Sequence, residues 1–499
     1  MCARRGWRRE SAPVQSASLV FDGFGEQRGD LAGAVFDQLF QHRLFRRSLA
    51  PVHSHVSMVG SQRHGIPEWE ARPPPGGGLI AFTASKVQDI RLQYLPPEAY
   101  EDFPLIRFDE ASRLICEIAK PLEKEAVPLE QADGRVLAES IVARRNSPST
   151  AVSAMDGYAL READLSQFPV RLGIIGNSFA GSGFNGTLPA GTCVRIFTGA
   201  PLPDGADRVV VQEEVESDGV TAVFYSMPGE RRHIRTAGSD FVTGDVLVAS
   251  GTVLRPQSMV AAAAANFSMV QAVRRPRILI ICCGDELVDP GSEQADDFSI
   301  PESISFGLGA MVRRWGGVVV DRWRKPDDLE MLKDCAKASV GLADIVVITG
   351  GASVGEKDFS KAMFVPLAPE FIFDKVAMKP GKPVWLARVQ KTMVVGLPGN
   401  PTSALVAARL FLAPLVAGMS GRAPTAALVW RTGKVTAPLL TSVDLEIFTR
   451  ARTSGATVTP LGNQDSAAQK ALADADVLIR CRAGGETIGI GSPVETLVL

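Results

Sequence analysis

Three glycine-containing loops in the second half of the chain have the residue types that bind oxyanions. They follow short apolar runs at 280–283, 345–348 and 393–395, and they begin at Gly284, Thr349 and Gly396. Glycine lets backbone N–H groups approach an anion closely, and a helix N-terminus adds a partial positive charge. The second and third loops are therefore expected to cradle phosphate. One such loop is often only a turn, whereas three on the same sheet edge indicate a binding site.

Charged side chains extend the predicted chemistry. Lys375, Lys379 and Lys382 lie in one proline-stiffened segment, which either binds an anion or forms a solvated basic turn. Carboxylates occur at predicted strand or turn ends, namely at Asp156, Glu286, Asp328 and Asp358. Carboxylates beside phosphate-type loops favour Mg²⁺, held by one or two of them and by substrate oxygens. The residues alone therefore predict a Mg²⁺-dependent enzyme that acts on phosphorylated small molecules.

An alternation of strands and helices must position these loops. Apolar runs at 278–281, 318–320 and 345–348 are separated by helical patterns at 303–315 and 327–340, which predicts βαβ units and a parallel sheet. In such sheets ligands bind beyond the carboxyl ends of the strands, where all three loops are expected to lie. A last helix is predicted at 402–416, with Pro414 in its final turn or at a kink.

The rest of the chain is organised differently. A helix is predicted from Leu105 to just before Pro121, and residues 121–240 alternate short apolar runs with Gly/Pro turns, which is typical of a β-rich, barrel-like body. Short strands return after about residue 424. The first 103 residues have an Arg-rich start and a Pro/Gly linker at 73–78, and we assign them no function.

Composition and residue usage exclude several classes of protein. A formal net charge of −2 gives no basic field for nucleic acid, and no apolar stretch reaches the roughly 20 residues that a bilayer requires. Scattered cysteines without a Cys-x-x-Cys pair indicate a reduced setting, so a cytoplasmic location is expected. Only His233 lies outside the first 64 residues, which leaves no zinc-protease motif and disfavours a Ser-His-Asp triad. The pair His53 and His55 could bind a metal but is more often an ordinary loop feature.

Six motifs in register resemble one protein family. They are Ser-Ala-Met-Asp-Gly-Tyr (153–158), Arg-Ile-Phe-Thr-Gly-Ala-Pro-Leu-Pro (195–203), Gly-Asp-Glu-Leu (284–287), Thr-Gly-Gly-Ala-Ser-Val-Gly (349–355), Lys-Pro-Gly-Lys-Pro (379–383) and Gly-Leu-Pro-Gly-Asn-Pro (396–401). In order and spacing they are similar to the molybdopterin molybdenumtransferases, which include the bacterial MoeA proteins and the E domain of gephyrin. The resemblance extends from about residue 104 to the C-terminus.

The resemblance implies a multidomain α/β plus β architecture. Its parts would be a helical linker domain at 104–150 and 240–273, a β-rich domain at 151–239, a molybdopterin-binding α/β domain with a mostly parallel sheet at 274–423, and a small C-terminal β-domain at 424–499. Residues 1–103 would be a poorly ordered extension of unknown role. The implied enzyme is a homodimer that inserts molybdate into adenylylated molybdopterin and releases AMP. Other proteins of molybdenum-cofactor biosynthesis are possible partners, and neither nucleic acid nor a membrane is expected.

The resemblance also carries residue roles onto this sequence. Catalytic roles fall on Asp156, Thr198, Asp240, Glu286, Asp328, Asp358, Lys375 and Lys379. Contacts to molybdopterin, its phosphates and molybdate fall on Gly284, Asp285, Thr349, Gly350, Gly351, Ser353, Gly355, Lys382, Pro398, Gly399, Asn400 and Ser466. Mg²⁺ would be held by Glu286, Asp328 and Asp358. The alternative, a molybdopterin-binding scaffold or assembly protein without turnover, is disfavoured because it has no need of so many charged groups.

Three positions depart from the family pattern. Cys283 stands where the family usually has Thr, Ile304 replaces its usual Asn, and Asp465 places a carboxylate beside Ser466, where it would oppose oxyanion binding. The adjacent Cys282 and Cys283 allow a redox interpretation, although two cysteines at a buried strand end more often fill the core.

Overall fold

The chain forms two compact units, Met1–Asp102 and Phe103–Leu499. The computed structural model describes residues 57–63, 66–72, 80–83, 104–292, 296–350 and 359–499. In the first unit three strands pair antiparallel in the order β1-β2-β3. They are β1 (Ser57–Arg63), β2 (Ile66–Arg72) and β3 (Ile80–Thr83). His53 and His55 lie outside the described residues, as does most of the segment that was expected to be poorly ordered.

A six-stranded sheet with the order β19-β16-β20-β24-β23-β21 forms the centre of the second unit. Its strands are β16 (Arg277–Cys283), β19 (Val318–Lys325), β20 (Ile345–Thr349), β21 (Glu370–Phe373), β23 (Trp385–Val389) and β24 (Thr392–Leu397). The first four strands in the sheet order are parallel, whereas β23 pairs antiparallel with both of its neighbours. This confirms the predicted, mostly parallel sheet.

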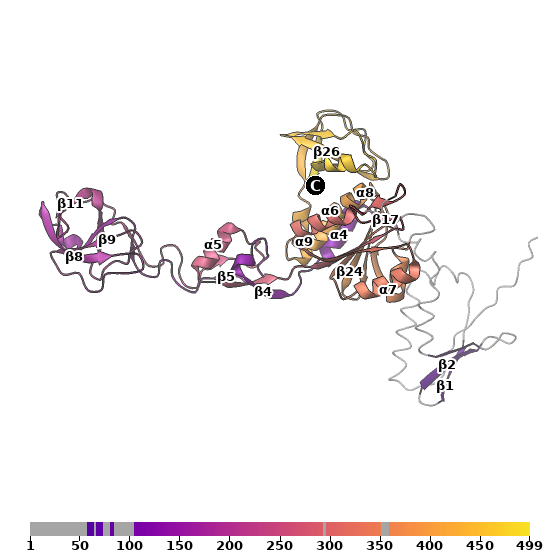
Figure 1. Ribbon diagram of the computed structural model, residues 1–499, viewed down its shortest axis with the longest axis horizontal. Helices are drawn as coiled ribbons and strands as arrows, with labels where there is room; N and C mark the ends of the chain where they lie inside the picture. The colour runs from indigo at the N-terminus through magenta and orange to yellow at the C-terminus, as the bar shows by residue number, and fades with distance from the viewer. Residues whose placement is uncertain (1–56, 64–65, 73–79, 84–103, 293–295, 351–358) are drawn as a thin grey trace, which may run out of the picture. The chain divides into compact units, whose positions relative to one another are not determined.

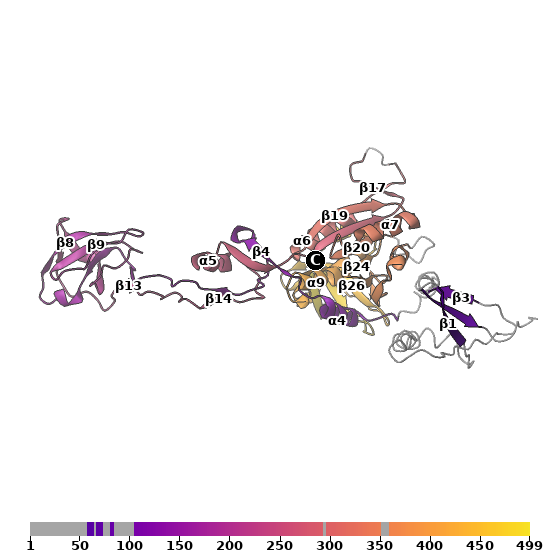
Figure 2. The ribbon, with the colours of Figure 1, turned by 90° about the horizontal axis from the view of Figure 1, so that it is seen from below.

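Helices cover both faces of this sheet (Figures 1 and 2). They are α4 (Phe108–Ile118), α6 (Ile304–Arg314), α7 (Leu329–Ser339), α8 (Pro401–Ala407) and α9 (Ala413–Met419). All but α7 share one core with Ile278, while α7 packs on the opposite face with Leu279, because successive strand residues point to opposite faces. Because Phe108, Ala111 and Ile115 lie on one helix face, α4 belongs to this core, although the expected boundary assigned it to the linker.

The apolar run after β24 folds as one interrupted helix. A π-helical turn covers Ala408–Leu412 between α8 and α9. Pro414 therefore lies in the first turn of α9, and π-turns and prolines are the usual places where a helix deviates from regular geometry. The run Pro401–Met419 is long and apolar enough to cross a membrane, but 94% of it is buried inside the protein. It is a core helix of the α/β domain.

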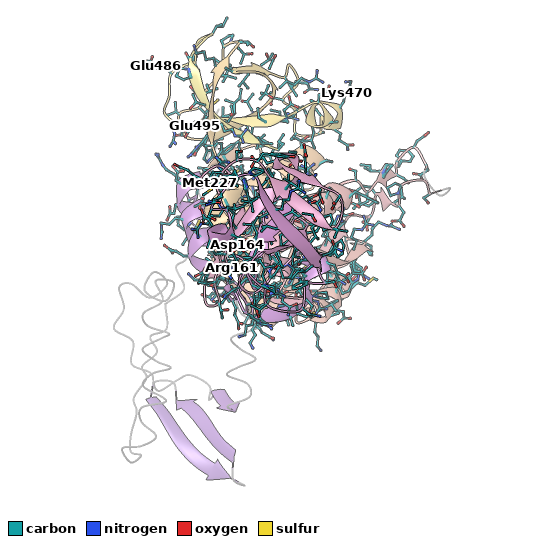
Figure 3. All side chains as sticks on the ribbon, turned by 90° about the vertical axis from the view of Figure 1, so that its left-hand side faces the viewer. Arg161, Asp164, Met227, Lys470, Glu486 and Glu495 are labelled. Atoms are coloured by element: carbon teal, nitrogen blue, oxygen red, sulfur yellow. The ribbon has the colours of Figure 1, made fainter. Side chains whose placement is uncertain are left out.

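The β-rich domain is built on a second six-stranded sheet, with the order β10-β7-β9-β8-β12-β11. Its strands are β7 (Gly157–Leu160), β8 (Val170–Ser178), β9 (Thr192–Ile196), β10 (Arg208–Val211), β11 (Val215–Ser217) and β12 (Thr221–Phe224). Tyr158, Leu160 and Phe224 lie in its apolar core. Figure 3 labels Arg161 and Asp164, which approach to 4.0 Å just after β7.

The chain passes twice through the linker region, so its short ladders join residues far apart in sequence. They pair β4 (Lys124–Pro128) with β15 (Met269–Val273), β5 (Ile141–Val142) with β14 (Val246–Val248), and β6 (Val152–Ser153) with β13 (Ile234–Arg235). One helix, α5 (Pro256–Ala264), accompanies them. The expected helical linker is thus largely made of strand pairs in the described residues.

The C-terminal β-domain closes on itself, because β26 pairs with both β27 and β28. Its elements are β22 (Met378–Lys379), β25 (Arg431–Val435), β26 (Glu446–Ser454), β27 (Thr457–Pro460), α10 (Gln469–Ala473), β28 (Val477–Cys481) and β29 (Pro493–Val498). Lys470, Glu486 and Glu495 mark this domain in Figure 3. The small β-domain expected at the end of the chain is therefore present.

Candidate functional site

The three glycine-containing loops begin at the carboxyl ends of β16, β20 and β24, which are parallel neighbours. This row of carboxyl strand ends is called the sheet edge. Gly350 has φ +85°, and a Cβ there would lie 2.1 Å from the carbonyl oxygen of Cys283. A Cβ on Gly399 would lie 3.3 Å from the Cα of Gly350. Gly350 thus lies against the end of β16 and close to Gly399 of the third loop. At Gly350 only glycine allows this approach.

Two carboxylates of the proposed metal set lie in the described part of this edge. Asp328 accepts a hydrogen bond of 2.9 Å from the Met331 N–H and so caps α7. Asp285 accepts a hydrogen bond of 3.0 Å from the Asp327 N–H, while the Glu286 carboxylate folds back over Gly284. Neither Glu286 nor Asp328 forms an ion pair with any described residue. Gly351, Ser353, Gly355 and Asp358 lie outside the described residues.

The chemistry of these donors suits Mg²⁺. In residues 104–292, 296–350 and 359–499, no group of three or more His, Cys, Asp or Glu side chains could hold a metal alone. The carboxylate oxygens of Glu286 and Asp328 are hard ligands, and Mg²⁺ commonly takes one or two protein carboxylates together with substrate phosphates. The residues present therefore fit a metal ion that binds with the substrate.

The lysine segment joins the α/β domain to the C-terminal domain. Its short strand β22 pairs with the start of β26. Lys375, Lys379 and Lys382 form no ion pair with described residues. The neighbouring Asp374 is 2% exposed and is paired instead with Lys361. Among the described residues, no ion pair balances the positive charge of the three lysines near the sheet edge, which favours anion binding.

A loop of the C-terminal domain reaches the third glycine loop. The Asn400 side-chain amide donates to the Ser466 hydroxyl at 3.1 Å, which brings two predicted ligands together. Arg450, fully buried on β26, donates to the Asp465 carbonyl at 3.0 Å and to the Thr402 hydroxyl at 3.3 Å. Burial lowers the pKa of Arg450, whereas the negative charge of Asp465 opposes that shift. Sequence reasoning missed Arg450, although an arginine between Phe448 and Ala451 on an apolar strand is a usable signal.

The departures from the family pattern have local explanations. The Asp465 carboxylate accepts a hydrogen bond of 2.8 Å from the Ala467 N–H and so stabilises the turn in which it lies. Glu302 accepts from the Ser305 N–H at 2.8 Å and from its hydroxyl, which stabilises the start of α6, while Ile304 is buried in the core. Cys283 is buried as well, and burial raises the pKa of its thiol.

Three predicted residues lie outside the α/β and C-terminal domains. Asp156 accepts from both the Thr198 N–H (2.7 Å) and the Thr198 hydroxyl (2.8 Å), and these bonds lower its pKa. Asp240 accepts from the Ser147 hydroxyl at 3.4 Å. In residues 104–292, 296–350 and 359–499, no side-chain hydrogen bond joins Asp156, Thr198 or Asp240 to the sheet edge. The structure therefore groups Asp156 with Thr198 but does not bring them to the loops within one chain.

Comparisons with known proteins match most of the second unit. The MoeA N-terminal region (domains I and II) matches residues 106–266, the probable molybdopterin-binding domain matches 279–418, and the MoeA C-terminal region (domain IV) matches 435–499. A molybdopterin molybdenumtransferase of Haemophilus influenzae is 35% identical over 321 residues, which cover 64% of this chain and 78% of the relative. The chain belongs to the molybdopterin molybdenumtransferase family. It is thus a transferase of molybdenum-cofactor biosynthesis.

Other relatives agree with this placement. The molybdopterin molybdenumtransferase 2 of Mycobacterium tuberculosis is 36% identical over 318 residues, covering 61% of this chain and 77% of that protein. Among solved structures, a molybdopterin biosynthesis MoeA protein from Pyrococcus horikoshii superposes with a TM-score of 0.69 at 27% identity, covering 79% of this chain and 99% of its own. The multidomain fold of this transferase is therefore the family fold.

Proposed function

We propose that this transferase inserts molybdate into adenylylated molybdopterin and releases AMP. The observation that carries the proposal is that glycine backbone and lysine side chains meet at one sheet edge. Gly399 is exposed there and Gly350 is half-buried, Lys379 is exposed and forms no ion pair with a described residue, and Ser466 approaches from the C-terminal domain. Such a constellation suits a substrate that carries phosphates and a second substrate that is itself an oxyanion.

In the proposed reaction the protein mainly binds and orients. Loop N–H groups around Thr349 and Gly350 and the start of α8 would hold the molybdopterin phosphate. Lys375 and Lys379 would attract the adenylate phosphate and molybdate, with Lys382 beside them. Glu286, Asp328 and Asp358 would hold Mg²⁺, which when bound neutralises phosphate charge. Arg450 holds the backbone of Asp465 and thereby positions the hydroxyl of Ser466.

We further propose that the enzyme works as a homodimer in the cytoplasm. The Asp156–Thr198 pair and Asp240 form hydrogen bonds in their own parts of the chain, so a second copy is the way in which they would reach a sheet-edge site. The family membership and the buried position of the helix Pro401–Met419 support a protein that needs no membrane. Other proteins of molybdenum-cofactor biosynthesis would supply the adenylylated substrate or accept the product.

Turnover by single variants tests the assigned roles. Lys379→Ala and Glu286→Gln should each lower AMP release from adenylylated molybdopterin by at least tenfold, because a hydrogen bond to a charged group contributes about 1.5–3 kcal/mol. Lys391→Ala is the matched control, since this exposed lysine lies in the turn before β24, at the opposite end of that strand. Unchanged turnover in the first two variants would refute the site.

The competing function is a molybdopterin-binding scaffold without turnover. It predicts that the wild-type protein binds adenylylated molybdopterin but releases no AMP when molybdate is added. The three lysines favour the enzyme, because a scaffold that only binds its ligand has no need of so many charged groups at the site.

A further inference from the structure

A groove of about 650 Å³ runs along α6, between that helix and the C-terminal domain. Gly307, Ala310, Met311 and Arg314 line one wall. Their spacing of i, i+3, i+4 and i+7 places them on a single face of the helix. The facing wall comes from the π-turn after α8, from the segment after α9 and from β29. A groove of this volume has the size of a small-molecule site.

Four arginines line this groove, namely Arg314, Arg409, Arg422 and Arg431. None of them forms an ion pair with a described residue, and no acidic side chain is among the lining residues. Four guanidinium groups without an acidic side chain in the lining give the groove a net positive charge.

Arg409 shows that this charge is partly desolvated. It is 5% exposed, and it donates to the carbonyls of Val498 at 2.7 Å and Ala427 at 2.6 Å. Its guanidinium lies 5.3 Å from the centre of the Trp315 ring, and burial lowers its pKa to about 10. A buried cation without a carboxylate partner is unfavourable. A bound anion would offset that unfavourable term.

Arg422 is a second partly desolvated cation in the lining of the groove. Its Nη2 donates to the Gly134 carbonyl at 2.9 Å, but its Nε is buried and lacks a hydrogen-bond partner. Burial, and then the nearby charge of Arg275, lower the pKa of Arg422. Together with Arg409 it adds positive charge that no acidic side chain of the lining balances, and a bound anion would offset this charge.

We propose that this groove is a second ligand site, which takes an organic phosphate. The phosphate would bind the guanidinium groups, whose planar forks match its oxygens, and the flat or apolar body would lie against Met311, Leu405 and Trp315. AMP and a phosphorylated pterin share this chemistry. The site is distinct from the sheet edge, because α6 runs back from that edge and Arg314 lies at its far end.

Equilibrium dialysis of the full chain at low salt tests the proposal. The ligands are AMP, pterin-6-methyl phosphate, adenosine and inorganic phosphate. Arg314→Gln and Arg431→Gln are the test variants, because both residues are exposed and neither makes a side-chain hydrogen bond with a described residue. Arg313→Gln is the matched control, since Arg313 is exposed on the same helix but does not line the groove.

We expect at least one of the two organic phosphates to bind about tenfold more weakly to each test variant and about a hundredfold more weakly to the double variant. The control should bind like the wild type, and AMP release at saturating substrate should stay unchanged in all three. The phosphate that shows this loss identifies the source of the ligand. Adenosine and inorganic phosphate should bind more weakly than the organic phosphates.

Four results would overturn the proposal. They are binding that the test variants leave unchanged, equal loss in Arg313→Gln, adenosine or inorganic phosphate that binds as tightly as the organic phosphates, and a double variant that elutes as a smaller species. The last result would show that the groove is a contact between copies of the chain. Because turnover is measured separately, failure of this proposal and failure of the proposed reaction are distinguishable.

Discussion

Replacement of Gly350 by alanine would have two costs at the sheet edge, one from the positive φ and one from the close contact with Cys283. A non-glycine residue in the left-handed region costs about 1–2 kcal/mol, and Gly350 has φ +85°. The new Cβ would also lie 2.1 Å from the Cys283 carbonyl oxygen, whereas close C···O contacts are about 3.3 Å. The second loop must therefore move by about 1 Å, which adds roughly 1–3 kcal/mol of overpacking.

Gly341→Ala is the matched control, because Gly341 has φ +84° with nothing within 4 Å of the added Cβ. Since 1 kcal/mol corresponds to about 2–4 °C in a domain of 150–250 residues, the control, at about 1.5 kcal/mol, should lower the thermal midpoint by about 4 °C, and Gly350→Ala, at about 3.5 kcal/mol, by about 10 °C. A displacement of about 1 Å near the chemistry should also lower AMP release about 100-fold in Gly350→Ala alone. Equal midpoints and equal rates in the two variants would refute the close-approach argument.

Three further outcomes are expected. Thr198→Val should raise the pKa of Asp156, as measured by NMR of its carboxyl carbon, and should lower AMP release, whereas Thr198→Ser should retain both values. An unchanged pKa of Asp156 in Thr198→Val would show that the hydroxyl of Thr198 does not stabilise the carboxylate. Burial alone would raise the pKa of Asp344, but the hydrogen bonds from Arg274 lower it overall. The ionised Asp344 therefore stabilises the folded protein at pH values above the ordinary aspartate pKa near 4, and this stabilisation is lost as the pH falls through the lower pKa of the folded state. Asp344→Asn should flatten this pH dependence of the thermal midpoint, and an identical slope would contradict the assignment. A variant lacking residues 1–103 should keep its midpoint and its AMP-release rate within error, whereas a drop of many degrees would show that the segment belongs to the folded enzyme.

Much of the α/β domain is predictable because its signals are local. The run 278–281 is apolar throughout, as a strand covered on both faces must be, and the structure extends it to β16. The helix predicted at 327–340 is α7, capped by Asp328. The contact between Gly350 and the end of β16, by contrast, was not predicted, because the glycines were expected only to let an anion approach.

Other features depend on contacts between distant residues, which no local pattern carries. The partners of Arg450 come from residues 402, 465 and 468, so its burial follows from the tertiary fold. The strand pairs of the linker join residues more than 80 positions apart, which a helical expectation could not anticipate. The same holds for the arginine groove, whose charges come from α6, the π-turn, the segment after α9 and β25. The residues at these places come together only in the folded chain.

Release of AMP by the wild-type protein tests the central claim most directly. Purified protein would be mixed with adenylylated molybdopterin in a single turnover, with and without molybdate, and both AMP and pterin-bound molybdenum would be measured. We predict that AMP appears only with molybdate, in equal amount to the molybdenum that enters the pterin. Release at the same rate without molybdate, or retention of AMP under both conditions, would contradict the assignment of this sheet edge as a molybdate-inserting site.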